Sequence, residues 1–170
     1  EIKPEAFFHC TTLKSFTIPD SVTEIGDGAF SGCTSLESIT IPESVIYVGN
    51  FIGCTSLESI AIPKSATSIG SFSKCTSLKS IKIPEGVTHI GLFDDCTSLE
   101  SVTIPEGVTK LYHWTFSCCT SLKSITIPES VDVIEDGAFE GCTSLESVLL
   151  HNRMNIRKAI FKGCTSLKSI

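Results

Sequence analysis

The stretch CTSLESI, residues 33–39, decides the fold of this chain because it returns at near-constant spacing. Near-copies begin at Cys54, Cys75, Cys96, Cys119, Cys142 and Cys164, and a looser copy begins at Cys10. Successive copies lie 21 to 23 residues apart. A unit of this length is too short for two packed helices, which need roughly 33–34 residues. It holds a short strand, a turn and a return segment, and it must stack on its neighbours to bury an apolar face.

The repeat predicts one continuous array over residues 1–170 without a linker. The units run roughly over residues 10–32, 33–53, 54–74, 75–95, 96–118, 119–141 and 142–163, with a partial unit at each end. Neither end reads as a polar cap, and solenoids need caps to shield their terminal faces. We therefore expect a fragment of a longer solenoid whose uncovered end units favour end-to-end self-association.

Composition excludes several classes of protein. The formal net charge of −6 argues against nucleic acid as a partner, because phosphate binding needs a clustered basic surface. No apolar run approaches the ~20 residues of a membrane-spanning helix. The hydrophobic fraction of 41% is ample for a core.

Each unit reads as a strand followed by a return. Ile39 and Ile41 alternate with Ser38 and Thr40, the period of a strand with one buried face. Pro42 lacks the N–H that a ladder needs and ends the strand. We expect one strand per unit, in a single parallel sheet on the concave side. The longer units carry two extra residues in the closing segment, which we expect to form a short helical turn or an irregular one.

The pattern Leu-x-x-Ile-x-Ile-Pro followed by Val-x-x-Ile-Gly-x-x-Ala-Phe-x-x-Cys resembles the BspA-like type of the leucine-rich repeat family, over essentially the whole chain. The resemblance implies an α/β solenoid, right-handed and curved, with mostly turns and short helical turns on its convex side. It also implies a surface or secreted protein, often linked to adhesion. The Asn that commonly follows the strand in such repeats is replaced here, so an Asn ladder is not expected.

Two ladders of equivalent residues predict core packing. The repeated cysteines stack in a line, whereas zinc ligands converge in pairs about two to four residues apart. We expect buried free thiols acting as small apolar groups. The phenylalanines at equivalent positions are also assigned to the core; they are Phe30, Phe51, Phe72, Phe93, Phe116, Phe139 and Phe161.

The outward side of the strands carries ranks of small polar and charged residues. The serine rank has no repeating His and Asp beside it and so lacks a general base. We expect no enzyme activity and no cofactor, and the four histidines show no metal-ligand spacing. A further rank mixes Lys and Glu, which relieves repulsion along the stack. It comprises Lys14, Glu37, Glu58, Lys79, Glu100, Lys123, Glu146 and Lys168.

Three residues on or beside the strand face are predicted partner contacts. Lys82 interrupts a rank that is mostly Thr, and Glu85 and Glu106 belong to a mostly acidic stripe after the prolines. The stripe suits a basic ligand or weakly held calcium. The alternative interpretation is a solvated rim that keeps the protein soluble.

The strongest departure from the repeat is the turn Tyr112-His113-Trp114, which replaces a Gly-Asp-Gly turn. Tyr and Trp are enriched at interface hot spots, so this turn is the best candidate contact site. The alternative is that Trp114 packs across the step between a long and a short unit. Cys118 is the extra cysteine, and we expect it to face solvent, to react with thiol reagents first and to belong to the same contact site. A second departure, at His151, Asn152 and Arg153, is interpreted as drift.

These features predict a protein-binding module, for adhesion or partner recognition at a cell surface. The alternative is a structural or self-assembling surface component with no specific ligand. The even Ser and Thr face favours this alternative, because specific sites usually hold varied, aromatic or Arg-rich anchors.

Overall fold

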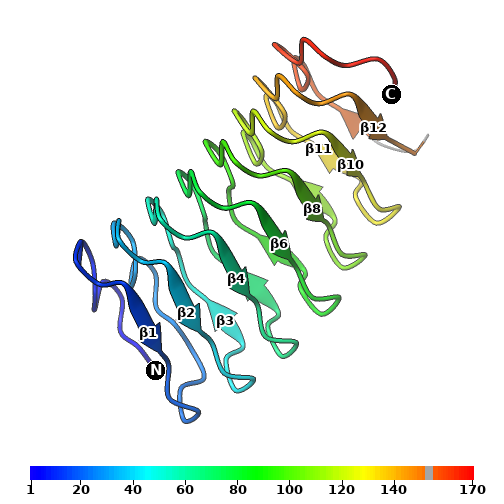
Figure 1. The fold of residues 1–170 in the computed structure, drawn as a ribbon. Coiled ribbons are helices and arrows are strands. Elements are labelled where there is room, and N and C mark those ends of the chain that lie inside the picture. The colour runs from blue at the N-terminus through cyan, green and yellow to red at the C-terminus, as the bar shows by residue number, and fades with distance from the viewer. Residues whose placement is uncertain (152–154) are drawn as a thin grey trace.

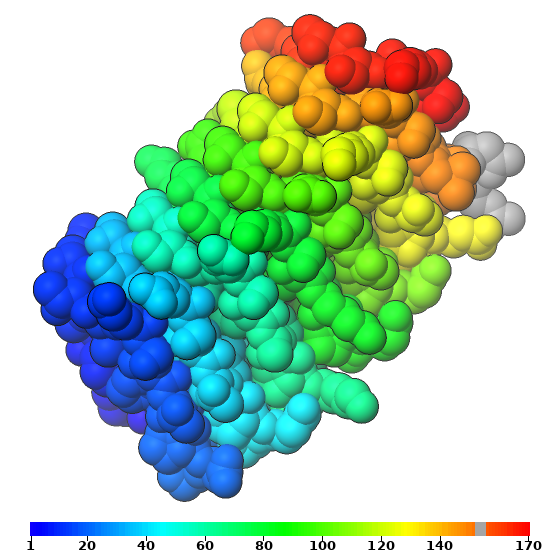
Figure 2. All heavy atoms as spheres, in the orientation of Figure 1, coloured from blue at the N-terminus to red at the C-terminus, as the bar shows by residue number. Residues whose placement is uncertain are grey.

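The chain forms a stack of turns that climbs from the N-terminus at one end to the C-terminus at the other (Figure 1). The structure is a computed structural model and describes residues 1–151 and 155–170. Each turn packs against the turns before and after it in the chain (Figure 2). The departure at Asn152 and Arg153 lies outside the described residues.

One ladder of strands follows the repeat that the sequence displays. It consists of β1 (Ser15–Thr17), β2 (Ser38–Thr40), β4 (Ser59–Ala61), β6 (Ser80–Lys82), β8 (Ser101–Thr103), β10 (Ser124–Thr126) and β12 (Ser147–Leu149). Equivalent residues pair in parallel, as in Ser59↔Ser80 and Ile60↔Ile81. The central residue of β4 is buried and its two neighbours are exposed, as the alternation predicts. Hydrogen-bonded pairing divides this ladder into β1–β2, β4–β6–β8 and β10–β12.

A second parallel ladder corrects the expectation of a single sheet. It consists of β3 (Tyr47–Val48), β5 (Ser68–Ile69), β7 (His89–Ile90), β9 (Lys110–Leu111), β11 (Val133–Ile134) and β13 (Asn155–Ile156). These strands lie behind the first ladder in Figure 1 and come from the return segment of each turn. They are two residues long, so their sequence is too short to display a period-2 pattern.

The expected helical turns are also wrong, because the described residues contain no helix. Consequently, no helix in this part of the chain could span a membrane. The two extra residues of a long unit form consecutive tight turns, in which Ala29 N donates to Gly26 O at 3.1 Å and Ser31 N to Gly28 O at 3.0 Å. Each of these bonds joins a carbonyl to the N–H three residues later, and the series stops after two such bonds. The segment is therefore a pair of turns and not a helix.

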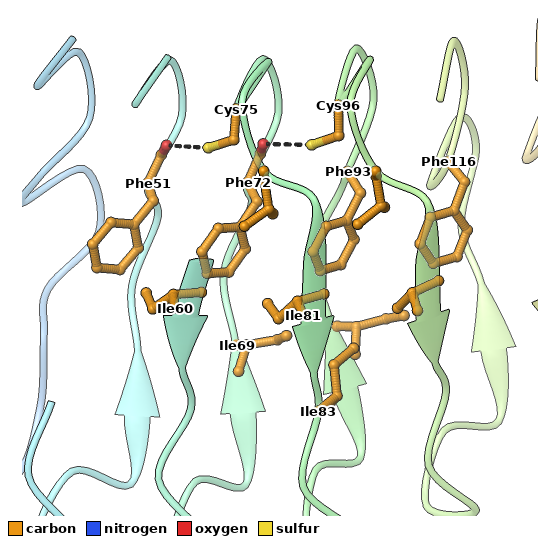
Figure 3. Close-up of a cluster of buried hydrophobic side chains, with 14 of the residues drawn as sticks. Phe51, Ile60, Ile69, Phe72, Cys75, Ile81, Ile83, Phe93, Cys96 and Phe116 are labelled. Atoms are coloured by element: carbon orange, nitrogen blue, oxygen red, sulfur yellow. Dashed lines mark hydrogen bonds between the residues drawn. The ribbon is translucent and has the colours of Figure 1, made fainter. Parts of the chain in front are cut away.

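Phenylalanines form the centre of the core, as predicted. Neighbouring rings from Phe30 to Phe161 stack with centroids 5.4–5.7 Å apart and planes within 6–19° of parallel. Phe51, Phe72, Phe93 and Phe116 are seen in line in Figure 3, above the buried isoleucines of both ladders. One ring per turn therefore makes a continuous column.

The repeated cysteines lie beside this column as free thiols, and six of them are fully buried. Each of these thiols from Cys33 onward donates to a backbone carbonyl of the preceding turn. Cys75 Sγ donates to Phe51 O and Cys96 Sγ to Phe72 O, both at 3.1 Å (Figure 3). The Phe51 carbonyl also accepts the Cys54 N–H at 3.2 Å. The thiols thus supply a hydrogen bond between turns, beyond the apolar role that the sequence predicts.

Candidate functional site

The exposed turn at residues 112–114 is the first candidate site. It forms an aromatic cluster, defined here as Tyr112, His113 and Trp114, with all three side chains exposed. Trp114 has a backbone φ of +60°, a left-handed conformation that its counterpart Gly137 also adopts at +67°. A residue with a side chain is strained there by roughly 1–2 kcal/mol, whereas glycine is not.

The indole of Trp114 lies against Gly137 of the next turn. A Cβ built at Gly137 would come within 2.8 Å of its Cδ1 atom, so the glycine leaves the space that the indole occupies. Yet 56% of Trp114 remains exposed. The packing interpretation therefore holds for one edge of the ring, and the rest is free to contact a partner.

The carboxylate of Glu135, on the next turn, contacts His113 of the cluster and the neighbouring Lys110. Glu135 Oε1 lies 2.5 Å from Lys110 Nζ, and Glu135 Oε2 lies 2.9 Å from His113 Nδ1. The backbone N–H of His113 also donates to Oε2 at 3.2 Å. The hydrogen bond from Lys110, with its charge, lowers the pKa of Glu135. Lys110 Nζ in turn lies 4.9 Å from the centre of the Tyr112 ring, a cation–π distance.

Sequence reasoning did not find Lys110 and Glu135, although a signal was present. Tyr112 and Glu135 take the place that Gly70 and Gly91 hold in shorter turns. A Cβ at Gly91 would lie 2.4 Å from the backbone of the preceding turn. Tyr112 and Glu135 carry side chains at this position in two consecutive long turns, so the two substitutions mark a place where the stack departs from its repeat.

Cys118 is less distinct than predicted. It is half-buried, and Cys10 and Cys164 are half-buried as well, so it is not the one accessible thiol. Its sulfur lies 3.7 Å from the Ser117 hydroxyl. The next turn partly covers it, because a Cβ at Gly141 would approach the sulfur to 3.2 Å.

Lys82, Glu85 and Glu106 are brought together at a second surface, on the outward side of the first ladder. Three adjoining hollows of about 420, 260 and 370 Å³ follow one another across β4, β6, β8 and β10. Lys82 lines the first and second, Glu85 lines all three, and Glu106 lines the third. None of these hollows includes a residue of the aromatic cluster, so the predicted contacts divide between two surfaces.

Comparison with known proteins identifies the fold family. Two matches to the BspA type leucine-rich repeat region, at residues 1–92 and 71–170, together span the chain. The chain therefore belongs to the BspA-type leucine-rich repeat family. A search of the curated proteins found no significant match.

Solved bacterial structures agree with this assignment. A leucine-rich repeat protein from T. pallidum is 32% identical with a TM-score of 0.86, over 91% of this chain and 78% of that one. One from Bacteroides ovatus is 33% identical with a TM-score of 0.75, over 98% of this chain and 57% of that one. A leucine-rich cell surface protein from Faecalibacterium prausnitzii is 27% identical with a TM-score of 0.61. That match covers 98% of this chain and 62% of its relative, so the chain spans about three fifths of these last two proteins.

Proposed function

We propose that this chain is a non-catalytic protein-binding module of a cell-surface protein, acting in adhesion or partner recognition. The aromatic cluster is its main contact. The family assignment and the relative described as a cell surface protein support the location.

The observation that carries the proposal is the exposure of Trp114. A large aromatic side chain occupies a left-handed position that Gly28 and Gly137 fill without strain and that Glu5 and Ala159 also occupy. The left-handed conformation therefore belongs to the repeat, whereas the large aromatic side chain is particular to this turn. More than half of this side chain is exposed, so burial in the core does not account for its presence.

The surroundings of the ring also suit a contact. Trp and Tyr are the residue types most enriched at interface hot spots, because they bring a large apolar area with few rotatable bonds. Glu135 restrains His113 and Lys110 beside them. A side chain that is ordered before binding loses less entropy when the partner arrives.

A structural role without a specific ligand is the second candidate. Its support is the serine rank, paired in register as in Ser80↔Ser101, which gives the first ladder an even outer face. A concentration series of native mass measurements separates the two candidates. Assembly makes the mass rise with concentration, whereas a binding module stays at one mass until a partner is added.

The proposal is tested by binding to an array of purified extracellular matrix proteins, using the wild type and a Tyr112→Ser/Trp114→Gly variant. We expect at least one matrix protein to bind the wild type, and the variant to bind about tenfold more weakly or worse, as loss of a hot spot predicts. The midpoint of unfolding should change little, because relief of the left-handed strain offsets the lost contact with Gly137.

Leu149→Ser is the matched control, because Leu149 is an apolar side chain that is 66% exposed on another turn. It should leave binding unchanged. Equal binding by the wild type and the double variant would exclude the aromatic cluster as the contact. Absence of any binding across the array would count against the proposed adhesion.

A further inference from the structure

The three hollows on the first ladder form one continuous depression, here called the strand-face trough. Its first end lies at Ala61 and Lys64, and its other end lies at Glu106 and Pro128. Shared lining residues join neighbouring hollows, Lys82 between the first two and Thr103 between the last two. It crosses four strands spaced ~4.8 Å apart, which is a span of ~14 Å. An extended peptide covers that distance with about four residues at ~3.3 Å each.

The first hollow exists because the repeat is broken there. Ala61 replaces the threonine found on other strands, such as Thr40 and Thr103, and so leaves only a methyl group on the outer face. The space is lined by Ile62 and Pro84, and Gly86 closes it without a Cβ. It is the largest of the three hollows and is mainly apolar.

Two lysines line this apolar space, and both break the repeat as well. Lys64 takes the place of Glu43 and Glu85 in the acidic stripe, and Lys82 takes the place of Thr103. Neither ammonium group pairs with a carboxylate among the described residues, although Lys79 on the same strand face does so with Glu58 at 2.7 Å. The two charges are therefore free to attract an anion.

The far end of the trough has the opposite charge. Glu85 and Glu106 line it, and within the described part of the chain neither carboxylate has an ion-pair partner. Hydroxyl groups of Ser101 and Ser124 line the same hollow and can bond to a peptide backbone. Glu85 also lines the first hollow, so the charged lining changes from two lysines and one glutamate at the apolar end to two glutamates at the other end.

We propose that the strand-face trough binds an extended peptide segment that carries an acidic residue beside an aliphatic one, and a basic residue about three positions away. The aliphatic side chain fills the hollow over Ala61, the acidic side chain pairs with Lys64 and Lys82, and the basic side chain lies against Glu85 and Glu106. Charge complementarity fixes the direction of the peptide across the strands. This inference rests on the proposed function in that the partner is a protein, but it uses a surface separate from the aromatic cluster.

The test uses four pentapeptides of identical composition, blocked at both ends. Two of them, Asp-Leu-Ala-Ala-Lys and its reverse Lys-Ala-Ala-Leu-Asp, place leucine beside the acid. The other two, Lys-Leu-Ala-Ala-Asp and Asp-Ala-Ala-Leu-Lys, place it beside the base. Binding is followed by amide chemical-shift changes in the labelled chain. We expect saturable shifts at β4, β6 and β8 with at least one peptide of the first pair, and affinity about tenfold or more weaker for the second pair.

An Ala61→Thr/Lys64→Glu/Lys82→Thr variant supplies the protein side of the test. Every substitution installs a residue that other turns carry at that position, so we expect the fold to be retained. The lining of the first hollow then matches that of the other turns. We expect its affinity for the favoured peptide to fall by about tenfold or more. Lys74→Asp is the matched control: it reverses an unpaired exposed charge within the same turns and should leave affinity unchanged.

Three results would overturn the inference: no shifts at millimolar peptide, equal binding of both peptide pairs, or unchanged affinity in the triple variant. These outcomes are independent of the matrix-protein array. If the chain binds matrix proteins through Trp114 but does not bind these peptides, only the inference about the trough is wrong. If it binds the peptides but no matrix protein, only the proposed aromatic contact is wrong.

Discussion

At the scale of single residues, a serine hydroxyl bonds some turns to the turn before them. Ser44 Oγ donates to Val22 O at 2.6 Å, and Ser65 Oγ to Val45 O at 2.8 Å. Gly86 and Gly107 hold the equivalent position in the next two turns and cannot make this bond. Restoring the serine should have opposite consequences at the two glycines, because the space beside them differs.

Gly86→Ser should stabilise the protein by about 1 kcal/mol. A Cβ at residue 86 would lie 3.5 Å from Ala66 O, an ordinary contact, and the new hydroxyl can donate to that carbonyl. Gly107→Ser should destabilise it, because a Cβ there would lie 2.8 Å from Val87 O. Urea unfolding of the two variants measures both effects. A similar change in both would show that the hydroxyl bond does not determine stability at this position.

At the scale of the elements, the phenylalanine column couples each turn to its neighbours. Phe93 is fully buried, and its ring centroid lies 5.5 Å from those of both Phe72 and Phe116. Phe93→Ala should destabilise the protein by ~3–5 kcal/mol, as truncation of a buried phenylalanine does. It should also make unfolding less cooperative, because turns of a solenoid unfold together only when the interfaces between neighbouring turns are stable.

The matched control is Phe8→Ala, since Phe8 is 49% exposed and lies outside the column. Its effect should be smaller than about 1 kcal/mol. The measurement is chemical denaturation followed by circular dichroism. Equal effects of the two substitutions would contradict the assignment of the column as the main coupling between turns.

The elements also show what a sequence can and cannot reveal in this fold. The alternation at Ile60 and Ile62 is long enough to predict the first ladder, its parallel register and its buried face. The second ladder arises from backbone approach between stacked turns, as between Tyr47 and Ser68, and needs no particular side chain. A buried apolar residue such as Val48 or Ile69 recurs in these strands, but two residues are too few to display a strand period. Among the site residues, the exposed Trp114 was predicted from its departure from the repeat, whereas the restraint of its neighbour His113 by Glu135 depends on contact between turns.

At the scale of the whole molecule, surface charge and buried thiols affect stability in different ranges of pH. A hydrogen bond from Lys79 lowers the pKa of Glu58, and one from Lys168 lowers that of Glu146. These groups stabilise the fold above the pKa of the unfolded chain, and the stabilisation is lost as the pH falls through the lower folded pKa. All of them are exposed, so salt screens the effect.

The buried thiols affect the free energy of unfolding at alkaline pH, and their effect is larger than that of the surface carboxylates. Burial raises the pKa of Cys54, Cys96 and Cys142 to about 12, from an ordinary value of 9.0. It also raises the pKa of Cys75 and Cys119. A thiol of this kind stabilises the fold fully below pH 9.0, and that stabilisation is lost as the pH rises towards the folded value. The free energy of unfolding should therefore fall above pH 9.0 by up to about 1.4 kcal/mol per pH unit for each such thiol.

Because unfolding lets all five thiols ionise at their ordinary pKa, alkaline unfolding should be a single steep transition well below pH 12. Urea unfolding at a series of pH values measures the slope, and a Cys75→Ala variant separates the thiols from lysine and tyrosine. That variant should be less stable at neutral pH, since it leaves a cavity and removes the bond to Phe51 O. Its stability should nevertheless decline less steeply with pH, by the contribution of one proton. An unchanged slope would mean that the folded chain ionises Cys75 as readily as the unfolded chain does, which a thiol sealed between two turns cannot do.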